Sequence, residues 1–416
     1  MKFMLISALL SVGHLNATNW SNWRGEEGAG VAREASPPGK VSSSQLWKAP
    51  LPGRGCSTPV VWEDLIVVTC VIHGKDGVLA YDQKGKEVWR HAFGKAAGVR
   101  HENAGSGCNP SALTDGKHIY VYFKSGTLAA VTMEGKEVWK RNLHQEYSPD
   151  GLKWDLGTSP IFAGGNVVVA LLHNENPSFL LAFDKLSGKE VWKTPRDYDA
   201  PAEAQDAYTT PFVTEIDGVE TIVTWGCDHL SGHDAKTGEE LWKHGDFNPQ
   251  QKKNWRVIAS AVETKGIAIV PFGRGDHVAG VKLGGRGDTT GKNRLWTHKG
   301  IGSDSSTPVA KDGKFYVLND KGPNRGMVTC LDAQTGKKEW QSKFPRSAAI
   351  YYASPLIAGD KIYAGRSDGV LFCGTITPKG LTDVVESDLE DTMIASPVAV
   401  GSKLFVRTHE SLWCFE

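Results

Sequence analysis

The chain has 416 residues, and its 47 basic side chains balance 47 acidic ones, so the formal net charge is zero. This balance gives no overall field that would attract nucleic acid or an anionic membrane, and it argues against both as partners. The 47 glycines, the 14 tryptophans and many runs rich in valine, isoleucine and threonine favour β-strands joined by tight turns.

The N-terminus has the pattern of a secretory signal peptide. Lys2 supplies the positive charge, Phe3 to Val12 is mostly apolar, and Ala17 is a small residue at a cleavage position, although Leu15 fits that pattern poorly. An apolar stretch of about ten residues is too short to cross a bilayer, and no other segment is long enough. We predict a signal peptide over residues 1–17, export to the periplasm or beyond, and no transmembrane segment; a plain N-terminal segment is the alternative.

The stretch Leu181 to Trp192, LAFDKLSGKEVW, is one copy of a pattern that recurs along the chain. An apolar strand enters a tight reversal at Asp184 and Gly188, and a second strand ends in the tryptophan. The indole is a large apolar plate that one hairpin cannot bury alone, so each copy implies a neighbouring unit. The predicted docking tryptophans are Trp47, Trp89, Trp139, Trp192, Trp242, Trp296 and Trp340, and an eighth copy degenerates to TDVVES around Val385.

A second landmark also occurs eight times, as a small residue followed by proline at the start of a strand. These positions are Pro59, Pro110, Pro160, Pro211, Pro308, Pro355 and Pro397, with Ala261 in the fifth copy. Trp47 to Glu416 spans 370 residues, and an eighth of that is about 46, close to the length of a four-stranded propeller blade.

The two ends of the repeat region complete each other. The chain begins this region with one strand, SSQLWKAP, and ends it with SLWCFE, which lacks a fourth strand. Pairing the first with the last closes the ring without an open edge. We predict an all-β, eight-bladed β-propeller of four-stranded antiparallel blades over residues 41–416, in which the N-terminal strand completes the C-terminal blade, preceded by an ordered arm over residues 18–40.

The seven cysteines are odd in number, so they cannot all pair within the chain. Cys330, Cys373 and Cys414 occupy a repeat position that holds alanine or glycine in other copies, which predicts buried thiols. Cys56 and Cys108 precede consecutive first strands, and a bridge between them is conceivable. The sequence leaves the state of that pair open.

The segments DKLSGKEVW, DAKTGEELW (234–242) and DAQTGKKEW (332–340) resemble the tryptophan-docking repeats of the pyrroloquinoline quinone (PQQ)-like β-propellers, over roughly residues 40–416. That family includes quinoprotein alcohol and sugar dehydrogenases, outer-membrane-assembly lipoproteins and many secreted propellers of unassigned role. The opening NWSNWRGEEGAGV (19–31) is similar to the start of the last group. The resemblance implies the fold and leaves the function open.

In such a blade the loops between the second and third strands, and those between blades, emerge on one face. Here these loops are long, dissimilar and polar, so we predict that this loop-rich face binds a ligand at its central funnel. The simpler alternative is that its polar groups only satisfy one another. The candidate ligand-binding residues are Arg54, His101, Asn103, Asp155, Asp206, Tyr208, Trp255, Arg256, Arg274, Asp304, Tyr351, Arg366 and Asp391.

Three functions from different classes fit this face. The first is an exported binding or scaffold module, predicted to be a monomer, with a protein or glycan partner. The second is a PQQ-dependent quinoprotein dehydrogenase, which would use arginines for the carboxylates of PQQ, an aromatic platform and Ca²⁺. The third is a carbohydrate-active enzyme that uses carboxylates and aromatic rings in the funnel.

The absence of two features weighs against the quinoprotein hypothesis. No two cysteines are adjacent, whereas the resemblance implies a disulfide between neighbouring cysteines beneath the cofactor, and no C-x-x-C-H haem attachment is present. The spacing of histidines and carboxylates also indicates no metal site. We therefore predict a binding or scaffold module without a committed cofactor or catalytic residue, and PQQ with Ca²⁺ remains the alternative.

Overall fold

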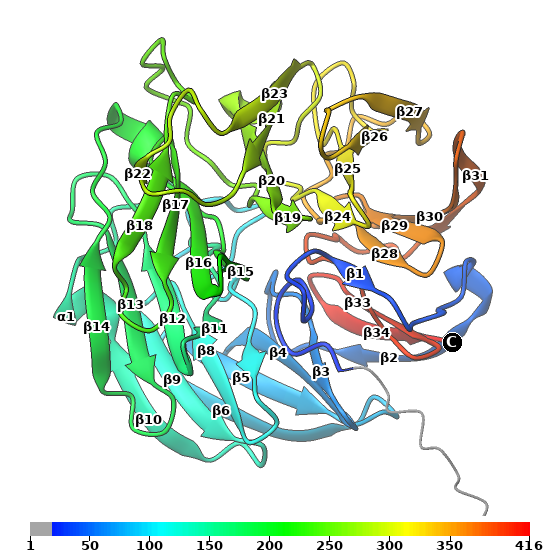
Figure 1. Ribbon diagram of the computed structural model, residues 1–416. Helices are drawn as coiled ribbons and strands as arrows, with labels where there is room; N and C mark the ends of the chain where they lie inside the picture. Colours follow the sequence, from blue (N-terminus) through cyan, green and yellow to red (C-terminus); the bar gives the residue numbers. More distant parts are fainter. Residues whose placement is uncertain (1–18) are drawn as a thin grey trace, which may run out of the picture.

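The computed structural model describes residues 19–416, and these form a closed ring of eight blades (Figure 1). The predicted signal peptide over residues 1–17 lies outside the described residues. Each blade contains four antiparallel strands, which we call A to D from the central axis outward. Two blades gain a short parallel edge strand, β1 in blade seven and β22 (Gly287–Asp288) in blade four. The predicted all-β, eight-bladed propeller is confirmed.

Seven blades take their four strands from consecutive stretches of the chain. Blade one consists of β3 (Val60–Trp62), β4 (Leu65–Ile72), β5 (Lys75–Tyr81) and β6 (Glu87–Lys95), and blade two of β7 (Leu113–Thr114), β8 (His118–Tyr122), β9 (Thr127–Thr132) and β10 (Glu137–Asn142). Blade three consists of β11 (Ile161–Ala163), β12 (Asn166–Leu171), β13 (Phe179–Asp184) and β14 (Glu190–Pro195), and blade four of β15 (Phe212–Ile216), β16 (Val219–Gly226), β17 (His229–Asp234) and β18 (Glu240–His244). Blade five consists of β19 (Val262–Thr264), β20 (Ile267–Phe272), β21 (His277–Lys282) and β23 (Arg294–Lys299). Blade six consists of β24 (Val309–Lys311), β25 (Lys314–Leu318), β26 (Met327–Asp332) and β27 (Lys338–Lys343). Blade seven consists of β28 (Leu356–Ala358), β29 (Lys361–Gly365), β30 (Val370–Thr377) and β31 (Gly380–Asp388).

The eighth blade joins the two ends of the propeller. Its strands A to C are β32 (Val398–Val400), β33 (Lys403–Arg407) and β34 (Ser411–Phe415), and its strand D is β2 (Gln45–Pro50) from the beginning of the chain. Trp47 on β2 pairs with Cys414, as Trp192 pairs with Ala182 inside blade three. The N-terminal strand therefore closes the ring as predicted.

Helical structure is sparse and short. It consists of α1 (Leu143–Glu146) and the 3₁₀ turns η1 (Val41–Ser43), η2 (Ala202–Gln205) and η3 (Gly273–Gly275). Within residues 19–416 no helix has the length and apolar character that a membrane-spanning helix requires.

The predicted docking tryptophans lie at the contacts between neighbouring blades. Trp192 packs on the strand C–strand D turn of blade four, where Gly238 adopts φ +76° and a Cβ would come within 2.5 Å of the indole. Trp139 packs in the same way on Gly188, and its Nε1 donates a hydrogen bond to the carbonyl of Lys185 at 2.9 Å. In the degenerate copy, Val385 pairs with Cys373 in the register that tryptophan has elsewhere.

All seven cysteines are free and buried. Cys330 and Cys414 pair with docking tryptophans, which confirms the small inward position predicted for them. Cys56 and Cys108, for which a bridge was conceivable, are separate thiols.

Eight hydroxyl side chains form a closed circle of hydrogen bonds around the axis. In each blade the amide just before strand A donates to the hydroxyl of the next blade, over 2.9 to 3.3 Å. The members of this hydroxyl ring are Thr58, Ser111, Ser159, Thr210, Ser260, Thr307, Ser354 and Ser396. The predicted proline follows the ring residue in six blades, and Ala261 follows it in the fifth. In blade two Ser111 is followed by Ala112, so the prediction for Pro110 was wrong by two positions.

The N-terminal segment runs across the inner strands. Trp20 exchanges two backbone hydrogen bonds with Val61 of blade one, at 2.8 and 2.9 Å. The short strand β1 (Val31–Ala32) then pairs parallel with β28 of blade seven, and the amide of Ser36 donates to Gly401 in blade eight. This segment, which we call the arm, therefore connects blades one, seven and eight, which are neighbours in the closed ring.

Candidate functional site

A cavity of about 410 Å³ opens at the axis on the loop-rich face, and we call it the funnel. Its floor includes five members of the hydroxyl ring and Trp23 of the arm. Its walls come from the loops that precede strand A in several blades, because these loops converge where the inner strands begin. Six of the thirteen candidate residues line it: His101, Asp155, Tyr208, Arg256, Arg274 and Asp304.

One wall of the funnel is a cluster of opposite charges centred on Asp304. Arg256 binds both oxygens of this carboxylate, at 2.8 and 3.2 Å, and the Nζ of Lys321 lies 2.6 Å from Oδ2. The Nε of Arg274 is 3.5 Å from Oδ1. Burial alone would raise the pKa of Asp304, but Arg256 and Lys321 hold it below its usual value. The carboxylate is therefore ionised and fully engaged with the protein.

Asp155 on the opposite wall is also occupied by the protein. It accepts hydrogen bonds from the amides of Arg100 and His101, at 2.9 and 2.8 Å, and from the buried ammonium of Lys124. Lys124 was not among the predicted residues, because it lies on a strand B–strand C turn of blade two with no distinctive local pattern. Together these contacts order the loop that carries His101.

Asp206 and Asp320, a residue of the same loop-rich face outside the thirteen candidates, act as buried acceptors for loop amides. Asp206 accepts from the amides of Lys153 and Asn174, at 3.0 and 2.8 Å, and burial raises its pKa. Asp320 accepts from the amide of Ser305 at 2.6 Å, and burial together with the charge of Asp304 raises its pKa to about 6. These carboxylates hold the walls in shape.

The remaining candidates do not reach the funnel. Asn103 is exposed, and Arg54 contacts His409 at 3.1 Å. Asp391 accepts from the amide of Glu410 at 2.9 Å on another part of the face. Trp255 packs against Phe272 and His277, and Arg366 binds Asp368 at 2.7 Å.

Tyr351 was predicted on the rim, but it is buried between Phe344 and Phe372. Its neighbour Tyr352 lines the funnel instead, because successive side chains of this extended loop point to opposite sides. Tyr352 lies 6.3 Å from the ring of His101, which is 5.6 Å from the ring of Trp154. The funnel therefore offers aromatic side chains for contact with a ligand, whereas its charged groups are paired with one another.

Cys56 and His409 form a thiol–imidazole contact at the funnel, with Sγ 3.8 Å from Nε2. The Nε of Arg54 donates to Nδ1 of this histidine, so in the neutral ring the proton lies on Nε2, which cannot then accept the thiol proton. Burial raises the pKa of Cys56 to about 11 and lowers that of His409 to about 4. The contact is not an activated nucleophile.

The funnel does not fit PQQ held by a calcium ion. Calcium needs six to eight oxygen ligands with free lone pairs, and the carboxylates of Asp155, Asp206 and Asp304 already accept bonds from cations or amides. Among residues 19–416, no group of three or more histidine, cysteine, aspartate or glutamate side chains is placed to hold a metal ion. Of the candidate arginines, the two that line the funnel, Arg256 and Arg274, are paired with Asp304.

The sequence pattern of one known family matches the chain in two overlapping segments, residues 39–195 and 124–375. The family is described as outer membrane protein assembly factor BamB. A protein of that name from Burkholderia pseudomallei is 24% identical to this chain over 379 residues, which are 88% of this chain and 86% of that protein.

Two solved structures show how widely the fold is shared. BamB from Moraxella catarrhalis superposes with a TM-score of 0.63 at 15% identity, over 89% of this chain and 99% of that one. A europium-containing methanol dehydrogenase superposes with a TM-score of 0.71 at 12% identity, over 96% and 98%. At these identities the likeness shows the fold alone, and fold does not decide function. Because the family pattern covers well over half of its length, the chain belongs to the PQQ-like repeat family described as outer membrane protein assembly factor BamB.

Proposed function

We propose that the chain is an exported scaffold that binds a protein partner through its loop-rich face. Export is supported by the signal-like pattern of residues 1–17. The relatives that bear the name outer membrane protein assembly factor favour a protein over a glycan as the partner, because an assembly factor acts on other polypeptides.

The pairing of the funnel charges is the observation that carries this proposal. Asp304 is neutralised by Arg256 and Lys321, and Asp155 by Lys124. A charged cofactor would have to break such buried pairs, at a cost of several kcal/mol (about 3–5 for one partner removed). Beside the paired charges, Trp154, Tyr352 and Ile394 line the funnel, and such aromatic and aliphatic surface suits the apolar side chains of a protein partner.

The same contacts keep the face in one conformation. Loops that are already ordered lose little entropy when a partner binds, so less of the contact energy is spent on ordering them. The amides held by Asp155, Asp206 and Asp320 fix three of the loops that surround the opening. The face is therefore a preorganised surface, which suits a scaffold.

A photo-crosslinker placed on the two faces tests the proposal. Benzoylphenylalanine would replace Ile350, which lines the funnel, and in a matched control it would replace Leu186, which is 64% exposed on the strand C–strand D turn of blade three. In the native host, irradiation is expected to join the Ile350 position to one or a few proteins and the control position to none of them. Absence of adducts at Ile350, or the same adducts at both positions, would overturn the proposal.

Two binding assays separate the alternative functions. In the first assay, the protein would bind a glycan, Tyr352→Ala would abolish that binding, and no protein adducts would form. This result would show that the partner is a glycan and not a protein. Stoichiometric binding of PQQ with Ca²⁺, accompanied by dye reduction with alcohols or sugars, would show a dehydrogenase and refute the scaffold. We expect neither result.

A further inference from the structure

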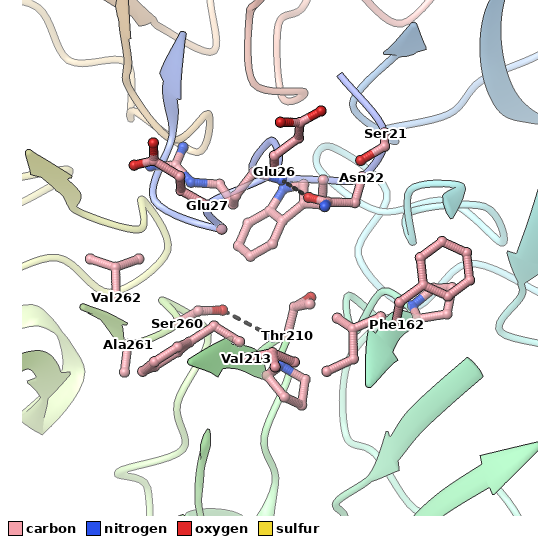
Figure 2. A pocket seen from close by; sticks show the side chains of 17 residues that line it. Ser21, Asn22, Glu26, Glu27, Phe162, Thr210, Val213, Ser260, Ala261 and Val262 are labelled. Carbon is pink, nitrogen blue, oxygen red and sulfur yellow. Dashed lines mark hydrogen bonds between the residues drawn. The ribbon is translucent and has the colours of Figure 1, made fainter. Parts of the chain in front are cut away.

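A second cavity, of about 260 Å³, lies between the arm and the inner strands of blades three, four and five. Figure 2 shows Asn22 and Glu26 on the arm side of this cavity and Val213 on the opposite side. We call it the arm groove. It is on the other side of the hydroxyl ring from the funnel, and Trp23 lines both cavities.

The arm forms backbone hydrogen bonds with the inner strands of four blades, one, two, six and seven. The amide of Val61 in blade one donates to Trp20 at 2.9 Å, and that of Thr114 in blade two donates to Ser21 at 2.9 Å. In blades six and seven, the amides of Ala310 and Ile357 donate to Ala29 and Gly30, at 3.3 and 3.0 Å. The inner strands therefore accept an extended chain as a further partner.

Blades three, four and five have no such cover within residues 19–416. Their inner strands β11, β15 and β19 are the terminal strands of their sheets. An uncovered edge presents a row of unpaired amides and carbonyls, which is a template for another extended chain. The arm groove follows these three edges, so it continues the interface that the arm makes with the rest of the ring.

The side chains beside these edges are apolar. Phe162, Val213 and Ile161 line the groove, and Trp23 of the arm closes it towards the axis. Phe162 and Val213 are only partly buried. In blade seven the equivalent place is filled, because Val31 and Ala32 of the arm are buried against the core there. Apolar side chains of an incoming chain would be buried here in the same way.

On the arm side of the groove Arg24 is buried, with its guanidinium on the carbonyls of Pro355 and Pro308 at 2.8 and 2.9 Å, so the exposed charges there are carboxylates. Arg33 binds Glu27 at 2.7 Å and Asp312 at 2.9 Å, whereas the exposed Glu26 forms no ion pair among residues 19–416. Burial raises the pKa of Glu263 on β19, and the charge of Glu27 raises it further. A ligand with a basic residue next to its apolar side chains would complement this field.

We propose that the arm groove binds an extended segment of a partner protein, with a basic residue among alternating apolar side chains, which pairs with the open edge of β15. The bound segment extends to β15 the backbone pairing that the arm makes with the inner strands of blades one, two, six and seven. This site lies on the face opposite the loop-rich one, so it is independent of the scaffold role proposed above.

The probe is a fluorescein-labelled peptide of seven residues, with alternating valine and threonine and a central lysine, titrated into the full chain by fluorescence anisotropy. We expect saturable binding, which weakens about fivefold when glutamate replaces lysine. A peptide methylated on its backbone nitrogens cannot pair with a strand edge, and we expect it not to bind. No saturation by the lysine peptide up to about 1 mM, the weak end of specific binding, would overturn the proposal.

Two variants locate the site. Val213→Arg fills the groove and should abolish binding, whereas Val138→Arg, on an exposed valine of β10, should not. Glu26→Gln changes only an exposed side chain, so it should fold normally and remove the preference for lysine over glutamate. Binding that survives both Val213→Arg and backbone methylation would refute the groove as the site.

Amide hydrogen exchange gives a second readout. The peptide should slow exchange of the amides of β15, and the outer strand β18 of the same blade should be unchanged. Sedimentation decides whether the occupant is instead a second copy of this chain. A dimer that the lysine peptide dissociates would overturn the proposal of a foreign partner, and a monomer at all concentrations supports it.

Discussion

The periphery and the axis of this propeller are built on different rules. At the periphery the blades present the same part, a tryptophan on strand D that only blade seven replaces, by Val385; Trp139 packs on Gly188 and Trp192 on Gly238 in a turn of the next blade. At the axis each blade contributes a different loop, and the loops are held by contacts that occur once, such as Arg256 with Asp304. The repeated parts determine the ring, and the single contacts determine the site.

Removing one docking tryptophan should have the largest effect and should be confined to stability. Trp192→Ala is expected to lower the free energy of unfolding by about 3–5 kcal/mol, because it empties a buried contact between two blades. The indole Nε1 has no hydrogen-bond partner among residues 19–416, so the loss is one of packing. Urea denaturation measures it.

The neighbouring Val191→Ala provides the control, since this valine is 48% exposed on the same strand. We expect a change within about 0.5 kcal/mol. Equal losses for the two variants would show that the junction between blades three and four does not depend on the indole. A folded Trp192→Ala protein that loses crosslinking at Ile350 would break the separation between periphery and axis.

The fold could be predicted from the sequence because its determinants are repeated. Seven intact copies of one spacing outweigh a single degenerate copy, and Val385 indeed takes the register of the missing tryptophan. Ring closure followed from a strand count at the two ends of the propeller. Even so, the start of blade two was misplaced, since Pro110 does not occupy the position that proline has in six other blades.

The site could be predicted only in part because its contacts join residues of different blades. Nothing near Lys124 indicates that its ammonium is buried against Asp155, which belongs to the next interblade loop. The choice between Tyr351 and Tyr352 depends on the path of one irregular loop. The position of the arm groove depends on the path of residues 19–36, and the sequence of this segment has no periodic pattern.

A buried histidine at a repeated position gives the next largest effect. His233 on β17 occupies the place that Phe183 has in blade three, as the strand registers show. Burial, and then the charge of Arg196, lower its pKa to about 3. The unfolded chain therefore binds a proton below about pH 6.5 that the folded chain does not, and stability falls as the pH falls.

This group should contribute a loss of about 1.4 kcal/mol per pH unit between about pH 6.5 and 3. His233→Phe restores the residue type of the other blades and should make the free energy of unfolding less dependent on pH in that window. Replacement of the exposed His73 by glutamine should leave the dependence unchanged. An unaltered slope in His233→Phe would mean that the ring is protonated in the folded protein.

The hydroxyl ring lies where the repeated and the irregular regions meet, and it gives the smallest expected effect. Ser260→Ala leaves the buried amide of Thr210 without its acceptor, which lies 3.0 Å away, and should cost about 1 kcal/mol. Ser260→Thr should be nearly neutral, because threonine fills the ring in blades one, four and six. Equal stability of the two variants would mean that the amide finds another acceptor.

Ser396→Ala removes the acceptor of the Ser354 amide on a distant blade. The stability losses of Ser260→Ala and Ser396→Ala should therefore add in the double variant to within about 0.5 kcal/mol. A larger combined loss would show that the hydroxyl ring acts as one cooperative unit. The axis would then be stabilised by a repeated contact, as the periphery is.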